Sequence, residues 1–326
     1  MIRAAIIGGS GYTAGELIRL LINHPDVEIS WIQSETNAGK RIDEIHQGLI
    51  GEIGDKTFTS ETPLEDADVI FFCTPHGKTK EWMSQNSERI PEHLRIIDLS
   101  TDYRIEDGTH EFIYGLPEIN RKRIVREGKY IANPGCFATA IQLALLPLAK
   151  NLLLNEDINV TAITGSTGAG IKPSATTHFS WRNDNVSIYK PFTHQHLNEI
   201  RQTLSTLQQS FSHDINFIPM RGPFSRGILA VVYMTTKMKE GDIIKLYEDY
   251  YDDHNFTFIS DKSVDLKDVV NTNKCLIHIE KIGDKLLITS AIDNLLKGAS
   301  GTAVHNMNLL FGLHERIGLK LKATGF

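Results

Sequence analysis

Residues 4–21 read AAIIGGSGYTAGELIRLL. The apolar run Ala4–Ile7 is typical of a short strand that is buried in a parallel sheet. Glycines at positions 8, 9 and 11 interrupt this run, and leucines at 17, 20 and 21 then recur at helical spacing. The segment therefore predicts a strand, a glycine-rich turn and a helix, which is the first unit of a doubly wound α/β domain.

The alternation of strand and helix signals continues through the first part of the chain. Further strand-like runs lie at residues 27–31, 67–72 and 95–99, with helical or loop segments between them. Because parallel strands are joined by crossover connections, this order predicts a single parallel sheet.

The pattern changes after the sequence Asn133-Pro134-Gly135. A helical stretch at 137–150 is followed by strands in which apolar and polar residues alternate, such as 160–163, 227–235 and 275–281. Such alternation favours a mixed, mostly antiparallel sheet in a second, α+β domain.

The length of 326 residues is about twice that of a common single domain, which also favours two hydrophobic cores. We expect a first domain at residues 1–135 and a second at residues 136–299. A helix at about 300–326 has apolar residues at helical spacing and is expected to dock back on the first domain.

Composition and charge exclude several classes of protein. The chain has 34 Lys+Arg against 40 Asp+Glu, and this net charge of -6 argues against a nucleic-acid-coating protein. We find no apolar run of the roughly 20 residues that a membrane span needs, and no signal-peptide pattern at the start. Three scattered cysteines do not form a disulfide framework, so we expect a cytoplasmic protein with reduced thiols.

The glycine turn predicts a dinucleotide site. Gly8, Gly11 and Gly15 lie where a strand passes into a helix, so backbone N–H groups and the positive end of the helix can hold a pyrophosphate. The spacing is imperfect, because Ala14 stands where a regular pattern would have its third glycine.

The end of the second strand indicates which nicotinamide nucleotide is bound. Ser34, Thr36 and Asn37 offer neutral hydrogen bonds, and Lys40-Arg41 follow, which favours the 2′-phosphate of NADP(H) over the free ribose of NAD. Glu35 argues against this interpretation. The alternative is a solvated polar loop that binds no ligand.

Cys136 is the candidate nucleophile. It follows Asn133-Pro134-Gly135 and begins a helix, where unpaired N–H groups and the helix dipole stabilise a thiolate and can also hold an oxyanion. Cys73 and Cys275 lie in apolar strand-like runs and are expected to be inert core residues. An inert, packed Cys136 is the alternative.

The candidate general acid/base lies in the sequence Thr193-His194-Gln195-His196-Leu197-Asn198-Glu199. His196 and Glu199 are three apart on one helical face, so the carboxylate can orient the imidazole, whereas His194 would act from the preceding loop. Both histidines could instead be capping or surface residues. A zinc site with Cys136 is conceivable, but no metal-binding motif supports it, and we predict no metal.

Arginines are the candidates for binding anionic groups of a substrate. Arg104 follows a strand end, and Arg221 or Arg226 lies in the stretch MRGPFSRG at 220–227. Each of them could instead be a surface ion-pair partner.

Taken together, these residues resemble the N-acetyl-gamma-glutamyl-phosphate reductase family of arginine biosynthesis along nearly the whole chain. The matching motifs are GGSGYTAGEL at 8–17, DLSTDYR at 98–104, YGLPE at 114–118, NPGCFAT at 133–139, GSTGAG at 165–170, HQHLNE at 194–199 and NLLKGASG at 294–301. The YGLPE and HQHLNE elements favour this family over the similar aspartate-semialdehyde dehydrogenases.

The resemblance implies a Rossmann-like NADP(H)-binding first domain, a second domain for catalysis and oligomerisation, and a homodimer or homotetramer with a small-molecule substrate. It implies that Cys136 is the nucleophile and His196 the acid/base. The residues implied in substrate binding are Arg104, Asn133, His194, Glu199 and Arg226. Those implied in cofactor binding are Gly8, Ser10, Gly11, Tyr12, Thr13, Ser34, Lys40, Ser166, Gly168 and Asn294.

The sequence departs from the family in two places. Residues 220–226 carry an extra Arg-Gly, which leaves open whether Arg221 or Arg226 binds the substrate carboxylate. The stretch FSWRNDN at 179–185 is expected to shape the pocket for the N-acyl group. An N-succinyl substrate, an aspartyl phosphate and a nucleotide-binding protein without catalysis remain alternatives.

Overall fold

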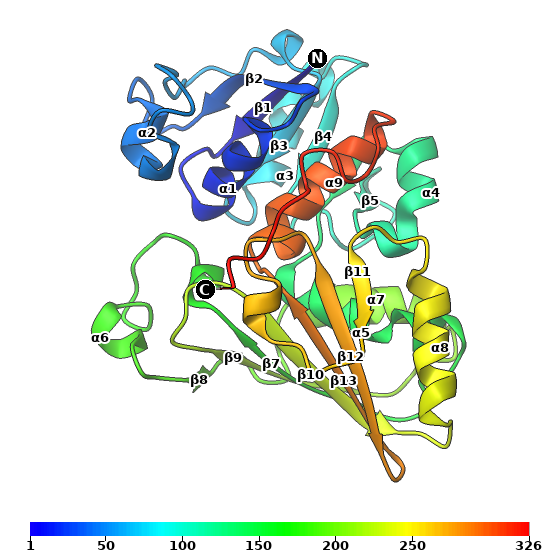
Figure 1. Cartoon of the computed structure of the whole chain (residues 1–326). Coiled ribbons are helices and arrows are strands. Elements are labelled where there is room, and N and C mark those ends of the chain that lie inside the picture. Colours follow the sequence, from blue (N-terminus) through cyan, green and yellow to red (C-terminus); the bar gives the residue numbers. More distant parts are fainter. Residues whose placement is uncertain (326) are drawn as a thin grey trace. The chain divides into compact units, whose positions relative to one another are not determined.

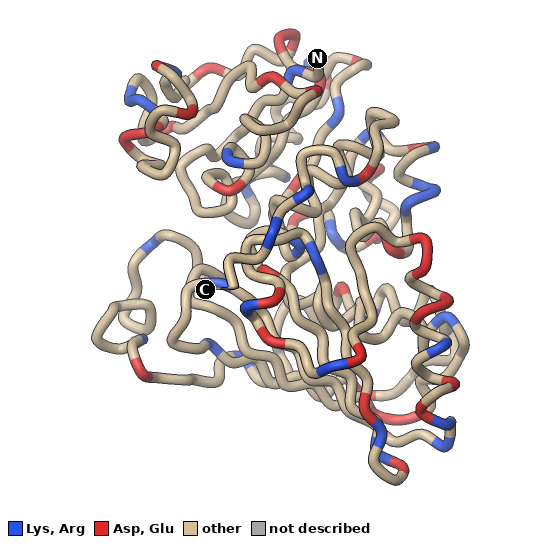
Figure 2. The backbone as a smooth tube through the Cα atoms, in the orientation of Figure 1, with Lys and Arg blue, Asp and Glu red and all other residues tan. Residues whose placement is uncertain are grey.

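The computed structural model describes residues 1–325, which divide into two compact units (Figure 1). The first unit comprises Met1–Pro134 and Ala299–Lys320. The second comprises Gly135–Gly298 together with residues 321–325. Lysine and arginine are interspersed with aspartate and glutamate along both units (Figure 2).

The first unit is built on the predicted parallel sheet. Its six strands run in the order β2-β1-β3-β4-β6-β5, and every neighbouring pair is parallel. All four side chains of the central strand β3 are buried, as expected of a sheet that is covered on both faces. The strands are β1 (Ile2–Ile7), β2 (Val27–Gln33), β3 (Val69–Phe72), β4 (Arg95–Asp98), β5 (Ile113–Tyr114) and β6 (Tyr130–Ala132).

Five α-helices belong to this unit within the described residues: α1 (Tyr12–Leu21), α2 (Ile42–Ile45), α3 (Lys78–Asn86), α4 (Pro117–Glu127) and α9 (Gly301–Leu310). The last helix, α9, packs against α1, α4 and β4. It is shorter than the helix expected at about 300–326. Gly312, at a φ of 67°, ends it, with Leu313 N donating to Asn308 O at 2.8 Å in a Schellman arrangement.

The second unit contains the expected mixed sheet. Seven strands run in the order β11-β12-β13-β10-β7-β9-β8, and all neighbours are antiparallel except the pairs β11–β12 and β7–β9. The strands are β7 (Ile158–Thr164), β8 (Ser187–Ile188), β9 (Ile215–Arg221), β10 (Ile228–Thr235), β11 (Thr257–Ser260), β12 (Cys275–Ile282) and β13 (Lys285–Ile292).

Helix α5 (Cys136–Lys150) is the centre of this unit and confirms the helix predicted at 137–150. It packs on β10 and β13 and against α7 (His196–Leu207); α6 (Phe179–Arg182) and α8 (Glu240–Tyr251) complete the unit's α-helices among the described residues. Pro147 inside α5 cannot donate to Leu143 O. The hydroxyl of Tyr251 donates to this carbonyl instead, at 2.5 Å.

Short 3₁₀ turns lie at Gln47–Leu49, Leu64–Asp66, Ser87–Arg89, Ser166–Ala169 and Leu266–Asp268, and a π-helical turn at Leu296–Ser300. Of the helices within residues 1–325, none combines the length and apolarity that a membrane crossing requires.

Candidate active site

The glycine turn between β1 and α1 is shaped as a phosphate cradle. Gly8 has a φ of 85°, which favours glycine, and a Cβ at Gly9 would overlap Ile32 and approach Phe58. Gly11 immediately precedes α1 as its N-cap, and a Cβ there would meet open space. No side chain at position 11 therefore covers the start of α1. Anion binding at a helix start requires that the first backbone N–H groups be accessible in this way.

The third glycine has a partner that the sequence did not indicate. A Cβ on Gly15 would lie 2.8 Å from His46 Nδ1, and His46 Nε2 lies 2.7 Å from Gly9 O. The absent side chain at position 15 thus lets the imidazole hold the glycine turn. Ala14, at the position where a regular pattern would have the third glycine, is fully buried. Packing thus explains why the glycine stands at position 15 and not at position 14.

The loop after β2 holds the residues that were predicted to select NADP(H). Lys40 Nζ donates to Asn37 Oδ1 at 3.3 Å, and Asn37 Nδ2 reaches Ser34 Oγ at 3.5 Å, so the three side chains form one hydrogen-bonded group. Arg41 instead forms ion pairs with Asp43 and Asp55. Lys40 is therefore the cation better suited to receive a phosphate.

Cys136 is the first residue of α5 and is partly exposed. Two glycines make room beside it. A Cβ on Gly298 would lie 2.8 Å from the Cβ of Cys136, and a Cβ on Gly135 would overlap His196 Nε2. The imidazole therefore lies against the backbone that immediately precedes the thiol, at a helix start that favours a thiolate.

Glu199 links this turn to the imidazole. Its Oε2 accepts a hydrogen bond from Gly135 N at 2.9 Å, and its Oε1 lies 3.9 Å from His196 Nε2. Glu199 and His196 are both buried on the first turn of α7, as their spacing of three predicted. The carboxylate thus fixes the turn and the imidazole with respect to each other.

His194 also belongs to this cluster, from the loop before α7. Its ring lies 4.6 Å from the ring of His196, and its Nδ1 accepts a hydrogen bond from His196 N at 3.2 Å. Burial, with the positive charges of Lys190 and Arg221, lowers the pKa of His194 to about 4. His194 is therefore a neutral hydrogen-bonding group near pH 7.

This pKa predicts a pH dependence of stability. A folded-state pKa of about 4, against 6.5 ordinarily, means that the unfolded chain binds more protons between these values, so stability falls as the pH drops through this window. The loss amounts to at most about 3 kcal/mol. In His194→Asn, Oδ1 can still accept from His196 N, and urea unfolding should show a smaller loss between pH 7 and pH 4.5 than in the wild type. An equal loss in both proteins would contradict the lowered pKa.

Two further predicted residues lie in the first unit. Arg104 is buried and donates from Nε to Asn133 O and from Nη2 to Leu99 O, at 2.9 and 3.0 Å. The Asn133 side chain donates to Ala299 O and accepts from Asn306 Nδ2. These bonds orient Arg104 and the segment that leads to the NPGC turn.

The predicted residues of the turn after β7 form a second group. Ser166 begins the turn Ser166–Ala169, and a Cβ on Gly168 would come within 3.3 Å of Thr164 Oγ1. Asn294 accepts from Gly227 N at 2.7 Å and donates to Thr167 Oγ1 at 3.1 Å, so it fastens the turn to the start of β10.

Arg226, one of the two arginines considered for the substrate carboxylate, has a partner within the chain. Its Nε and Nη2 lie 3.1 and 3.0 Å from Oδ2 of Asp293, which is fully buried. Arg221 differs: its guanidinium lies over the ring of Tyr189, at 4.6 Å from the centroid. The Tyr189 ring in turn lies 5.8 Å from that of His194. Tyr189 could not be predicted from the sequence, because it follows the short strand β8 and carries no local motif.

The other two thiols have different surroundings. Burial raises the pKa of Cys73, and Cys275 is a buried residue of β12 whose Sγ lies 3.3 Å from Ser290 Oγ. Within residues 1–325 none of the three cysteines is in a disulfide. The same residues contain no cluster of three or more His, Cys, Asp or Glu side chains that could hold a metal ion.

Two family models match the chain. Residues 3–126 match the NAD binding domain of semialdehyde dehydrogenases, and residues 136–294 match the dimerisation domain of semialdehyde dehydrogenases.

Individual proteins are similar over the full length. The N-acetyl-gamma-glutamyl-phosphate reductases of Parabacteroides distasonis and Phocaeicola vulgatus are 65% and 64% identical, and the alignments cover 100% of both chains. The crystal structure of aspartate semialdehyde dehydrogenase II from Vibrio cholerae is 17% identical, with a TM-score of 0.72 over 96% of this chain and 99% of that chain. At this identity, the likeness concerns the fold.

Proposed function

Because this chain belongs to the semialdehyde dehydrogenase family, and within it to the N-acetyl-gamma-glutamyl-phosphate reductases, we propose that it reduces N-acetyl-gamma-glutamyl phosphate with NADPH to N-acetyl-L-glutamate 5-semialdehyde and phosphate. This is a step of arginine biosynthesis. The observation that carries the proposal is the position of His196 Nε2 against Gly135, directly before Cys136 at the start of α5.

In the first half of the reaction, His196 Nε2 takes the proton of the Cys136 thiol, and the helix start stabilises the resulting thiolate. The sulfur attacks the carbonyl carbon of the acyl phosphate. A C–S bond forms, the bond from carbon to the phosphate oxygen breaks, and a thioester is left on Cys136. N–H groups of the first turn of α5 stabilise the negative oxygen in the transition state.

NADPH, when bound, supplies the hydride that reduces the thioester carbonyl. His196 gives its proton to the oxygen that gains negative charge, so that a thiohemiacetal forms on Cys136. The same nitrogen takes this proton back when the C–S bond breaks. The aldehyde leaves, and the thiolate is regenerated. Glu199 keeps the imidazole at the turn throughout.

Further residues are assigned to substrate binding by the resemblance. Arg104 is proposed to bind the phosphate, and its bonds to two backbone carbonyls fix the direction of its guanidinium. Asn133, His194, Glu199 and Arg226 are assigned as groups that contact the substrate or orient the base. The hydrogen bonds that Asn133 and Arg226 form within the chain favour an orienting role for these two.

We assign cofactor binding chiefly to the first unit. Gly8, Ser10, Gly11, Tyr12 and Thr13 would hold the pyrophosphate at the start of α1, and the open space beside Gly11 supports this fit. Ser34 and Lys40 would bind the 2′-phosphate. The assignment of Ser166, Gly168 and Asn294 to the cofactor rests on the resemblance alone.

Replacing Lys40 by alanine tests the preference for NADPH. The variant loses one charge-assisted bond to the 2′-phosphate, so the KM for NADPH should rise about tenfold. NADH lacks this phosphate and serves as the internal control, since its KM should not change. Equal effects on the two nucleotides would contradict the assignment of Lys40.

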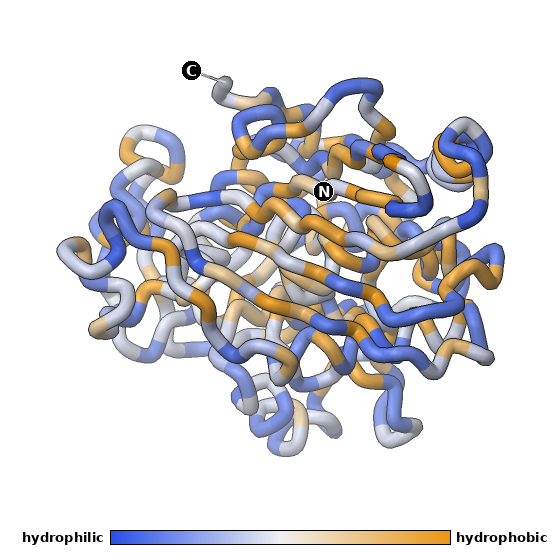
Figure 3. The backbone as a smooth tube through the Cα atoms, turned by 90° about the horizontal axis from the view of Figure 1, so that it is seen from below, coloured by the Kyte–Doolittle hydropathy of each residue, from blue (hydrophilic) through white to orange (hydrophobic). Residues whose placement is uncertain are grey.

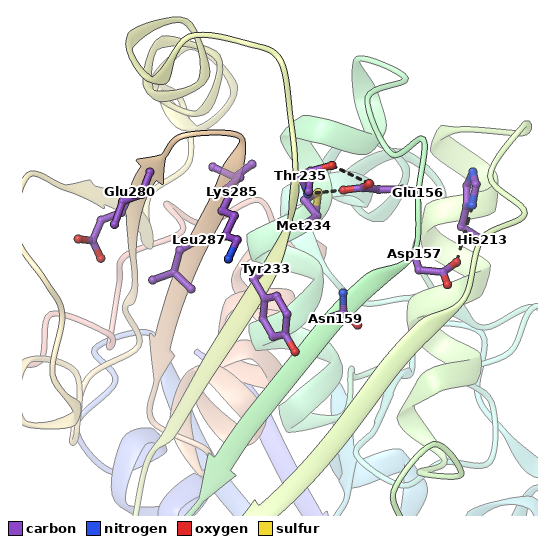
Figure 4. A pocket seen from close by; sticks show the side chains of 12 residues that line it. Glu156, Asp157, Asn159, His213, Tyr233, Met234, Thr235, Glu280, Lys285 and Leu287 are labelled. Carbon is purple, nitrogen blue, oxygen red and sulfur yellow. Dashed lines mark hydrogen bonds and ion pairs between the residues drawn. The ribbon is translucent and has the colours of Figure 1, made fainter.

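The open face of the seven-stranded sheet is proposed to join two copies of the chain. Alternate residues of β10 and β13 pack toward α5, and their neighbours are half-buried or exposed, among them Val231, Tyr233 and Leu287. Residues of high and low hydropathy are interspersed along the backbone (Figure 3), and a cavity of about 1050 Å³ lies on this surface (Figure 4). The match to a dimerisation domain supports a homodimer or a dimer-based homotetramer.

Leu287→Glu tests this surface. A buried, unpaired carboxylate in each copy should shift the sedimenting species from the assembled form toward the monomer. Val125→Glu, at an exposed position on α4 of the first unit, is the control and should leave the assembly intact. A monomeric wild-type protein would contradict the proposal.

The reaction also suggests where the protein works. A thiolate nucleophile stays active in a reducing compartment, where NADPH is also available, so we place the enzyme in the cytoplasm.

The reverse reaction is the direct test of function. Wild-type enzyme should reduce NADP in the presence of N-acetylglutamate 5-semialdehyde and phosphate or arsenate, and it should be much slower with aspartate 4-semialdehyde. A preference for the aspartyl compound would identify an aspartate-semialdehyde dehydrogenase instead. Tight NADPH binding without turnover of either would indicate a nucleotide-binding protein without catalysis.

A further inference from the structure

The two arginines near the end of β9 differ in how their charge is balanced. The carboxylate of Asp293 accepts from Arg226 and also from the backbone N–H groups of Asn271 and Leu295, so Arg226 belongs to a buried structural network. Arg221 forms no ion pair among the described residues, and its Nε is buried without a hydrogen-bond partner. A half-buried guanidinium with no anion beside it lowers the stability of the fold. A bound ligand that carries an anionic group would remove this cost.

A second guanidinium reinforces the positive charge around Arg221. Arg182, from α6, is 5% exposed and donates to the carbonyls of Asn185 and Arg221 and to Ser187 Oγ. It forms no ion pair within the described residues. Its pKa is lowered by burial and by the charge of Arg221. Arg182 thus ties the segment 176–187 to the end of β9 and fixes the backbone that presents Arg221.

The backbone around this group is held in unusual conformations. Asp184, Lys190 and Phe192 have φ values of 54°, 46° and 59°, in the left-handed region that non-glycine residues rarely occupy. Such conformations cluster where the surrounding structure must present side chains in a defined way. Here these three residues lie on either side of Tyr189 in the sequence, and the guanidinium of Arg221 lies over the Tyr189 ring.

This group adjoins the catalytic cluster. Consecutive contacts run from Arg221 to the Tyr189 ring, from Tyr189 to His194, and from His194 to His196. The rings of His196, His194 and Tyr189 thus form a row that ends at the guanidinium of Arg221. A substrate whose carbonyl carbon is at Cys136 could extend along this row and place a charged group at Arg221.

We propose that Arg221, held by Arg182 and Tyr189, is a specificity-determining residue that binds a carboxylate of the substrate. The inference rests on the proposed function and deepens it. A planar guanidinium suits a carboxylate, and the surplus of cations in this group needs an anion. Two carboxylates could fill the position: the α-carboxylate of the glutamyl unit, or the terminal carboxylate of a dicarboxylic N-acyl group such as N-succinyl.

The test compares wild type, Arg221→Met and Arg221→Lys with N-acetyl- and N-succinyl-glutamate 5-semialdehyde. Arg221→Met should raise the KM at least tenfold with kcat changed less than threefold, and Arg221→Lys should recover part of the loss. A raised KM for both substrates identifies the α-carboxylate as the ligand of Arg221. A raised KM for the N-succinyl substrate alone identifies the acyl carboxylate. Arg201→Met, at an exposed arginine on α7, is the matched control and should behave as wild type.

An unchanged KM for both substrates in Arg221→Met, with an active wild type, would overturn this inference and leave the proposed function intact. A wild type that turns over neither substrate would remove the function itself. Should the variant fail to fold, wild-type enzyme is tested with substrates in which the α-carboxylate or the succinyl carboxylate is a carboxamide. At least one replacement should raise the KM tenfold, and no effect of either would reject a carboxylate subsite.

Discussion

Cys136→Ser is expected to lower kcat for phosphate-dependent NADP reduction by at least about 10³-fold, because a serine hydroxyl is far less acidic than a thiol and no thioester can form. The helix start that stabilises the thiolate cannot ionise a hydroxyl near pH 7. The measurement is initial-rate absorbance at 340 nm with saturating semialdehyde and phosphate.

Two controls show that the loss concerns the chemistry. NADPH binding, followed by nucleotide fluorescence, should be unchanged in Cys136→Ser, since the cradle lies at the start of α1. Cys275→Ala removes a thiol that is fully buried in β12 and should lower stability while activity remains. Substantial turnover by the serine variant would exclude the covalent route.

His196→Asn is expected to lower kcat about 10²–10⁴-fold, because the amide can neither take the thiol proton nor protonate the oxygen of the thiohemiacetal. The substitution keeps a polar side chain beside Gly135 and Glu199, so the fold should persist. Rapid mixing with the acyl phosphate should show slower release of phosphate before any reduction, since thiolate formation is the first step that needs the imidazole.

The matched control is His213→Asn, at a half-exposed histidine that pairs with Asp157 in the same unit. It should have wild-type kcat. If His196→Asn retained wild-type phosphate release and lost only reduction, the thiolate would form without this imidazole and His196 would act only in the second half of the reaction.

Much of the candidate site could be predicted because it depends on neighbours in the sequence. The glycine turn, the position of Cys136 at the start of α5 and the shared face of His196 and Glu199 follow from strand-to-helix geometry and helical spacing. The parallel and mixed sheets also follow from the order and patterning of strands, and the structure confirms both.

The end of the last helix was harder to predict. Apolar residues at helical spacing indicated a helix after residue 300, but Gly312 ends it in a left-handed conformation. Spacing gives the face of a helix, whereas its end depends on how the carbonyls of the last turn are bonded.

The sequence by itself thus determined the fold class, the position of Cys136 at a helix start, and the shared helical face of His196 and Glu199. Only the tertiary structure decided that His46 supports the glycine turn, that Asp293 balances Arg226, and that Arg221 lies over Tyr189 beside His194. These contacts join residues that sheet register and loop closure bring together across the chain. Local spacing fixes which side chains share a turn or face, but the balance of a buried charge depends on every element packed around it.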